Sequence, residues 1–277
     1  MPWRRAVFIL MTATLCRAAA GELRAALPSY GAIAGEIDGA RNLREPTLAP
    51  ILRSSLPREI AGMRREDFAA AAFAVDAKCR RFAVVFRSAS EPAWERLWRL
   101  TAPHLVPAPN AGAGVYSFQN VGRDLRRGRF AVCGDRGGAL YLNCPEHFRR
   151  DAGGIPAELQ RIFPSDKLAA VAGLPRLKGD PFRSIRRFRA WVEPIPGGRF
   201  RLAGDARFDQ PVHASFGKFA LTGIFALWLQ EYLNLPPEAA SELISRVRMR
   251  QREAEIRFEF SDFEYLGQLM RAQLEPR

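Results

Sequence analysis

The chain has 277 residues, of which 48% are hydrophobic, with 42 Lys and Arg against 29 Asp and Glu and a formal net charge of +13. This length allows one large domain or two of ordinary size, and the hydrophobic content argues against a disordered chain. The excess of positive charge favours anionic neighbours such as lipid headgroups or acidic polymers. The sequence contains no recognisable nucleic-acid-binding motif, and we expect no nucleic-acid partner.

The first twenty residues have the layout of a secretory signal peptide. Arg4 and Arg5 precede an apolar run over residues 6–16, and small residues follow up to Ala20. The run is too short to span a bilayer, which needs about 20 residues. We therefore expect export, with cleavage near Ala20, a secreted or periplasmic location and no transmembrane segment afterwards. An uncleaved anchor and a lipoprotein attached at Cys16 are the alternatives.

A short motif occurs twice and organises the rest of the chain. Leu27–Gly35 reads LPSYGAIAG and Phe163–Gly173 reads FPSDKLAAVAG, each an apolar–Pro–Ser start running into a strand of small apolar residues. Each copy is followed by two apolar runs around a tight turn, a helix, further strands and a closing helix. The sequence predicts an α+β fold of two similar modules, each an antiparallel-rich sheet with helices packed on one face. We place the signal peptide at 1–20, the first module at 21–153 and the second at 154–277.

In the first module, apolar runs bounded by turn residues predict strands, and capped periodic runs predict helices. Ser90 is placed to cap a helix in which Pro92 is tolerated in the first turn and Pro103 marks the end. The expected strands are 31–37, 68–75, 82–86, 115–118, 129–133 and 139–142. The other expected helices are 46–53 and 145–150, and 56–65 is expected to be either a second short helix or an irregular connection.

In the second module, the helix over 212–233 is the most apolar segment after the signal peptide. Residues 219–230 carry no charge, which we interpret as burial on nearly all sides. Phe216, Phe219, Phe225 and Trp228 are therefore expected to be buried between the modules, the alternative being an exposed partner-binding stripe. The expected strands are 168–174, 185–192, 200–208, 246–251 and 254–260. The other expected helices are 156–162, 238–244 and one capped by Ser261 or Asp262.

The last two strands alternate strictly between apolar and charged residues. With a turn at Arg252 and Glu253, Arg250 is expected to face Glu255, and Arg246 to face Glu259. Both modules together allow either two sheets side by side or one sheet continued across the chain.

No motif fixes a chemistry. Cys144 and His147 are close in sequence, but residues three apart at a helix start need not converge, and nothing supplies a third, orienting group. Asp205, Asp209 and His213 are spaced by four, but a proline interrupts the series. The serine-hydrolase G-x-S-x-G and the phosphate-binding G-x-x-x-x-G-K do not occur. We predict no catalytic residues, no metal site and no cofactor.

Three cysteines remain after cleavage: Cys79, Cys133 and Cys144. An odd number outside the cytoplasm allows one disulfide with a free thiol, or three reduced thiols. The sequence leaves both possibilities open.

Two arginine clusters form the candidate binding site. The first lies in a predicted loop and the second at the start of a predicted strand. If the modules are equivalent, the clusters could lie near each other and form an anion patch, whereas a solvated face is the alternative interpretation. Their members are Arg123, Arg126, Arg127, Arg129, Arg183, Arg186, Arg187 and Arg189.

These features predict an exported, non-catalytic binding or structural protein of the bacterial cell envelope or periplasm, with an envelope protein or an anionic polymer as its partner. One alternative is an anion-binding surface protein that acts through the arginine clusters, whose binding should weaken as salt rises. The other is a hydrolase with a fold-assembled site, which requires His147 or His213 within hydrogen-bond reach of a nucleophile and an acid.

Overall fold

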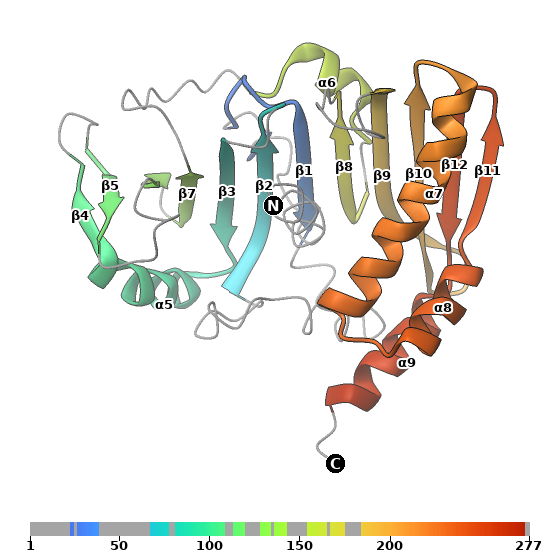
Figure 1. Ribbon diagram of the computed structural model, residues 1–277. Coiled ribbons are helices and arrows are strands. Elements are labelled where there is room, and N and C mark those ends of the chain that lie inside the picture. The colour runs from blue at the N-terminus through green and yellow to red at the C-terminus, as the bar shows by residue number, and fades with distance from the viewer. Residues whose placement is uncertain are drawn as a thin grey trace.

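The protein is a mixture of helices and strands built on one large antiparallel sheet (Figure 1). The computed structural model describes residues 23–24, 27–38, 67–77, 81–108, 113–119, 128–133, 136–142, 154–164, 167–174 and 184–274. Within these residues the sheet has 12 strands in the order β11-β12-β10-β9-β8-β1-β2-β3-β7-β6-β5-β4. One sheet therefore continues across both predicted modules.

The bounds of the elements agree closely with the predicted pattern. The strands of the N-terminal half are β1 (Ile33–Asp38), β2 (Phe68–Val75), β3 (Phe82–Ser88), β4 (Leu105–Pro107), β5 (Val115–Phe118), β6 (Arg129–Cys133) and β7 (Gly137–Leu142). Those of the C-terminal half are β8 (Ala169–Gly173), β9 (Ile185–Ile195), β10 (Arg199–Phe208), β11 (Arg248–Arg252) and β12 (Glu255–Phe260). The helices are α5 (Glu91–Thr101), the 3₁₀ helix η3 (Ala102–His104), α6 (Ala157–Ile162), α7 (Pro211–Leu227), the π-helix η6 (Trp228–Tyr232), α8 (Pro237–Ser245) and α9 (Phe263–Leu274). The helices expected at 46–53 and 145–150 and the segment 56–65 lie outside the described residues.

The two halves of the sheet have corresponding strand orders. From the centre outward, the N-terminal half runs β1, β2, β3, β7, β6 and the C-terminal half runs β8, β9, β10, β12, β11. The two first strands pair with each other, and Gly35 of β1 lies opposite Val171 of β8. In the chain, α5 follows β3 as α7 follows β10. Strands β4 and β5 extend the N-terminal half beyond the shared pattern.

Helices cover both faces of the sheet. α7 crosses the front face of the sheet in Figure 1. On this face Phe260 of β12 packs against Phe225 of α7, and Phe86 of β3 packs against Trp94 of α5. On the back face, Leu159 of α6 is fully buried in an alanine-rich cluster at the centre of the sheet. The prediction of helices on one face therefore holds for α5 and α7–α9 but not for α6. Alanines on the back of β1, β2 and β8 leave room for a helix there.

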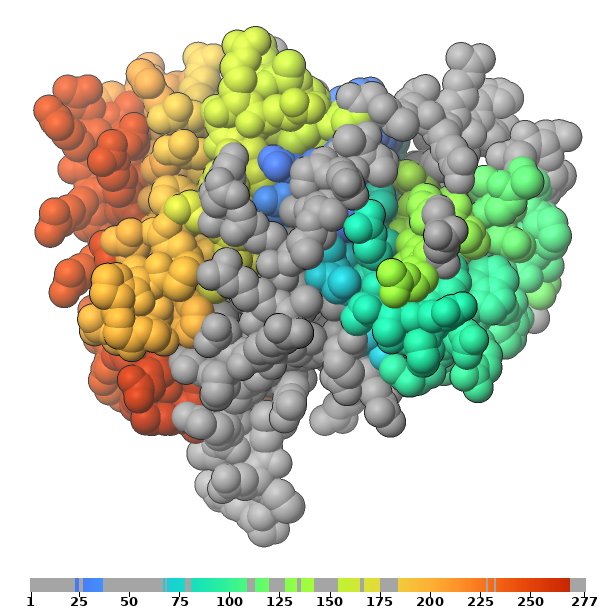
Figure 2. All heavy atoms as spheres, turned by 180° about the vertical axis from the view of Figure 1, so that it is seen from behind, coloured from blue at the N-terminus to red at the C-terminus, as the bar shows by residue number. Residues whose placement is uncertain are grey.

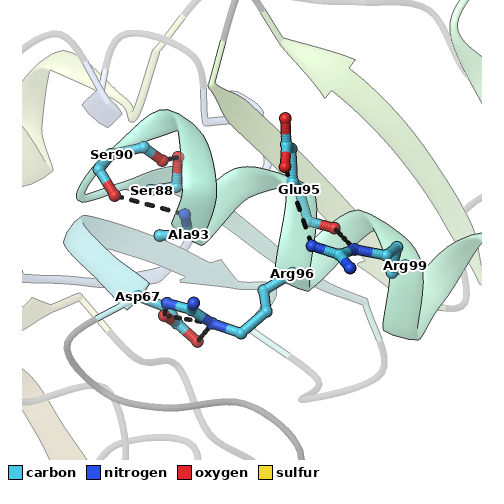
Figure 3. Close-up of polar contacts among 7 residues, drawn as sticks. All are labelled: Asp67, Ser88, Ser90, Ala93, Glu95, Arg96 and Arg99. Atoms are coloured by element: carbon cyan, nitrogen blue, oxygen red, sulfur yellow. Dashed lines mark hydrogen bonds and ion pairs between the residues drawn. The ribbon is translucent and has the colours of Figure 1, made fainter.

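Ser90 caps α5 (Glu91–Thr101), as predicted. The Ser90 hydroxyl accepts a hydrogen bond from the backbone N–H of Ala93, with an N–Oγ distance of 3.3 Å (Figure 3). Farther along the helix, Arg96 forms an ion pair with Asp67, a fully buried carboxylate directly before β2. A cap, an ion pair and an apolar side therefore hold α5 on the sheet.

The C-terminal hairpin has a different register from the predicted one. The observed opposite pairs are Arg248–Glu259, Arg250–Arg257 and Arg252–Glu255. Arg250 and Arg246 therefore do not face Glu255 and Glu259, because the turn is one residue later and includes Glu253 with a φ of 52°. The shift in pairing is two residues, which leaves every side chain on its predicted face of the sheet. Alternation alone could not distinguish the two registers.

Candidate functional site

α7 is a highly apolar helix. Its sequence, PVHASFGKFALTGIFAL, contains a single Lys or Arg, Lys218, and no acidic residue. Pro211 stands at its start, where a missing N–H leaves no hydrogen bond unmade. Among the described residues, the stretch Pro211–Glu231 is the one helix that is long and apolar enough to cross a membrane, by length and composition alone. The sequence led us to expect no segment of membrane length after the signal peptide, so this helix was not anticipated.

The inner side of α7 packs closely on the front face of the sheet. Gly217 lies against the ring of Phe208, where a Cβ atom would come within 2.2 Å of the ring. Farther along, the rings of Phe225 and Phe260 are 5.8 Å apart between centroids. Ala214 is fully buried on the same side. Small residues therefore let the helix approach the strands.

The outer side of α7 is also apolar, and it is exposed. Val212, Phe216 and Phe219 are 52%, 62% and 78% exposed. Together with the exposed Gly223 they follow a spacing of 4, 3 and 4 residues, which places them on one side of the helix. We call these four residues the α7 stripe; it is about 17 Å long at 1.5 Å per residue.

The exposure of the α7 stripe corrects a prediction. Phe216 and Phe219 are not buried between the modules, and only 24% of the most apolar part of Pro211–Glu231 is buried within the protein. Phe225 packs inward against Phe260, and the side chain of Trp228 is not among those described. A run without charge indicates apolar surroundings on all sides, but it does not say that the surroundings are protein.

The corresponding helix of the N-terminal half has an ordinary surface. Glu95 and Arg99 form an ion pair at i, i+4 on the outer side of α5, 3.8 Å between Oε2 and Nη2 (Figure 3). Leu100 is the large apolar residue exposed on this helix, at 41%. Helices in this position of the fold can therefore face solvent with charged residues, and α7 does not.

The back face of the C-terminal strands is a second candidate surface. Alternate residues of β9–β12 point toward it, because side chains of a strand alternate between faces. Figure 2 shows the molecule from this side, with the orange and red C-terminal strands at the left. We call this surface the arginine face; it consists of Arg187, Arg189, Arg201, Arg207, Arg248, Arg250, Arg252 and Arg257 with Glu193, Asp205, Glu255 and Glu259.

Carboxylates neutralise the part of the arginine face nearest the sheet centre. Glu193 accepts hydrogen bonds from Arg201, at 2.6 Å between Nη2 and Oε1, and from Lys167. Burial alone would raise the pKa of the Glu193 carboxyl, but these hydrogen bonds outweigh burial and lower the pKa to about 2. Asp205, which is 4% exposed, accepts from Arg189 at 2.9 Å between Nε and Oδ2.

Four of the eight arginines predicted as an anion patch lie within the described residues. Arg129 is on β6, and Arg186, Arg187 and Arg189 are on β9. Five strands separate β6 from β9, which is about 29 Å along the sheet at about 4.8 Å per strand. The described members therefore do not form one patch, and anion binding by these clusters stays a prediction. Those outside the described residues are Arg123, Arg126, Arg127 and Arg183.

The described arginines of the second cluster have carboxylate partners. Arg186 pairs with Asp209, and Arg187 lies 3.9 Å from Asp205 between Nε and Oδ1. The two aspartates that sequence spacing related to His213 are thus engaged by arginines. Within the described part of the chain, no group of three His, Cys, Asp or Glu residues could hold a metal ion.

Two of the three cysteines and one histidine considered for chemistry cannot be placed. Cys133 lies on β6 and is half-buried. Cys79, Cys144 and His147 lie outside the described residues. The hydrolase alternative therefore stays a prediction that the described residues do not test.

No protein-family model matches the sequence, and no curated protein matches it. Among solved structures, crystal forms III, I and IV of TP0453 are similar, with TM-scores of 0.49, 0.46 and 0.47 and 8% sequence identity each. The matches cover 90% of this chain and 97%, 96% and 95% of the respective TP0453 chains. At this identity and these TM-scores the likeness says nothing about function, and only the surfaces of the protein itself bear on it.

Proposed function

We propose that this protein is an exported, non-catalytic protein of the cell envelope that binds a membrane surface through the α7 stripe. The observation that carries the proposal is the exposure of Phe216 and Phe219 on a helix of membrane length whose only lysine or arginine is Lys218. Large exposed apolar patches mark contact sites for proteins or membranes.

The composition of α7 favours lipid over a protein partner. Protein interfaces combine an apolar centre with a polar rim that forms hydrogen bonds. The α7 stripe instead runs along the helix without an acidic residue beside it, and Lys218 carries the one full charge. A lysine next to an apolar stripe can extend its ammonium group to lipid headgroups while its stem stays in the apolar layer. Aromatic residues with a nearby basic residue are typical of helices that lie in a membrane interface.

The charge and the amino-terminal sequence support the same location. Removal of Arg4, Arg5 and Arg17 with the signal peptide lowers the formal net charge from +13 to +10, which still adds long-range attraction to anionic lipids. The predicted signal peptide at residues 1–20 would deliver the chain to a compartment bounded by membranes. An exported basic chain with an apolar outer helix fits a protein that rests on an anionic bilayer.

We further infer that the two halves arose by duplication. Support comes from the corresponding strand orders and from a shared packing detail. Gly35 of β1 faces the ring of Phe73 on the next strand, and Gly173 of β8 faces Phe188 on its next strand; an added Cβ atom would come within 2.0 Å and 2.4 Å of these rings. In this interpretation α5 and α7 are equivalent helices, and only one of them acquired an apolar outer side.

Flotation with lipid vesicles tests the membrane proposal. The chain from Gly21 onward would be mixed with vesicles of phosphatidylethanolamine and phosphatidylglycerol, and compared with the double variant Phe216→Ser/Phe219→Ser. Burying both rings contributes about 2–4 kcal/mol. The double variant is therefore expected to partition at least about 30-fold more weakly.

Leu100→Ser provides the matched control, because Leu100 is an exposed apolar residue on the equivalent helix. This variant should float like the wild type. All three proteins should unfold at similar urea concentrations, since substitutions at exposed positions change stability by about 0.5 kcal/mol or less. Wild-type protein that stays with the soluble fraction, or a double variant that floats fully, contradicts the proposal.

A further inference from the structure

The edge strand β11 carries a row of exposed arginines. Arg248, Arg250 and Arg252 alternate with Met249 and Gln251, so that all three lie on the arginine face. Alternate residues of a strand are about 7 Å apart, and the row therefore spans about 14 Å. Within the described part of the chain, none of the three forms an ion pair.

The two carboxylates opposite the row are bound to other arginines. Glu259 lies 3.6 Å from Arg201, between Oε1 and Nη1. Glu255 accepts a hydrogen bond from Arg257 at 2.8 Å, and this bond lowers the pKa of the Glu255 carboxyl. The row therefore keeps its charge toward solvent.

The register of the hairpin adds to this charge. Arg250 lies directly opposite Arg257, whose side chain is 78% exposed. Like charges at opposite positions destabilise a strand pair. A register shifted by two residues would place Arg250 opposite Glu255 and keep every side chain on its face. The observed register therefore places Arg250 and Arg257 side by side, although the shifted register would pair Arg250 with a carboxylate.

We propose that Arg248, Arg250 and Arg252, with Arg257 beside them, bind an extended polyanion that carries phosphate groups along its length. The planar guanidinium group binds phosphate oxygens through two parallel hydrogen bonds. A single phosphate can occupy one arginine of the row, whereas a linear chain of phosphates can contact all three. The row lies on the opposite face of the sheet from α7, so this site does not depend on the membrane contact.

Binding of inorganic polyphosphate tests the site, with tripolyphosphate and orthophosphate as shorter probes. Affinity should rise steeply with chain length and fall with salt. In Arg248→Gln/Arg250→Gln/Arg252→Gln the affinity for long polyphosphate should drop at least about tenfold. The slope of log affinity against log salt concentration should become less negative by about two to three.

The triple variant Arg99→Gln/Arg136→Gln/Arg161→Gln is the matched control, because it removes the same net charge from exposed arginines away from the row. It should retain most of the wild-type affinity and slope. An equal loss in both triple variants would mean that polyphosphate responds to net charge alone, and it would overturn the site. Absence of polyphosphate binding by the wild type would overturn it as well.

Arg250→Glu separates binding from folding. This change places a carboxylate opposite Arg257, so the melting temperature should rise while polyphosphate affinity falls at least about tenfold. Its flotation with phosphatidylglycerol vesicles should equal that of the wild type. Lost flotation would assign the arginines to lipid phosphate and overturn the polymer site, and unchanged polyphosphate affinity would also overturn it.

Discussion

α5 and α7 hold corresponding places in the two halves of the sheet, yet they differ in how they meet their surroundings. Leu97 of α5 is buried against the sheet, while its outer side carries the Glu95–Arg99 ion pair. α7 buries Ala214 and Gly217 and presents Phe216 and Phe219 outward. A helix in this position can be amphipathic and fully compatible with water. The apolar outer side of α7 is therefore a property of that helix, not a requirement of the fold.

The difference between α5 and α7 distinguishes residues that stabilise the fold from residues that contact a partner outside the protein. Replacing Leu97 by Ala should lower the free energy of unfolding by about 2–5 kcal/mol, because it leaves a cavity under α5. Replacing Phe219 by Ala should change it by about 0.5 kcal/mol or less, because the ring is 78% exposed. Urea denaturation of both variants measures the contrast.

A large loss of stability in Phe219→Ala would mean that the ring packs within the folded chain. The helices would then differ in composition but not in role. A small loss in Leu97→Ala would mean that α5 contributes little to the folded state.

The back face shows a second contrast, between its alanine-rich centre and the arginine face. Glu193 is ionised near neutral pH, and its folded-state pKa of about 2 lies below its usual value near 4.5. Its contribution to stability is therefore present above about pH 4.5 and lost as pH falls toward 2. With two partly exposed partners, Lys167 and Arg201, that contribution is about 1–2 kcal/mol.

Glu193→Gln should accordingly be less stable than the wild type by this amount at pH 7, and the difference should vanish near pH 2. Urea midpoints measured across this range provide the test. A difference that persists unchanged at pH 2 would show that packing of the side chain, and not its charge, stabilises the strands.

Lys218 gives the smallest expected effect. A basic residue near an anionic bilayer contributes about 1 kcal/mol. Lys218→Gln should therefore bind phosphatidylglycerol vesicles about fivefold more weakly, while its binding to neutral phosphatidylcholine vesicles stays the same. Equal weakening on both kinds of vesicle would show that the ammonium group does not act through lipid charge.

Most strands and helices could be predicted because their patterns are local. The bounds of β2, β5 and β6 agree with the sequence prediction to the residue, and Ser90 caps α5 as expected. β4 was missed because it is a three-residue edge strand that ends at Pro107, inside a stretch with loop composition.

Features that depend on distant parts of the chain could not be predicted in the same way. The register of β11 and β12 depends on where the turn forms. Glu253 adopts a positive φ in this turn, and a glutamate in the sequence does not predict a positive φ. Continuation of one sheet through β1 and β8 depends on pairing between segments far apart in the sequence. The exposure of α7 was not predicted, because the hydropathy of a helix indicates an apolar environment but does not show whether protein or lipid provides it.

The most direct test of the central claim compares the two helices in one measurement. An environment-sensitive NBD fluorophore would be attached to a cysteine at position 219 or at position 100, by Phe219→Cys or Leu100→Cys in a background with the native cysteines replaced by serine. On addition of phosphatidylglycerol vesicles, emission at 219 should shift to the blue and increase, while emission at 100 should not change. Equal responses at both positions, or none at 219, would contradict a membrane contact through α7.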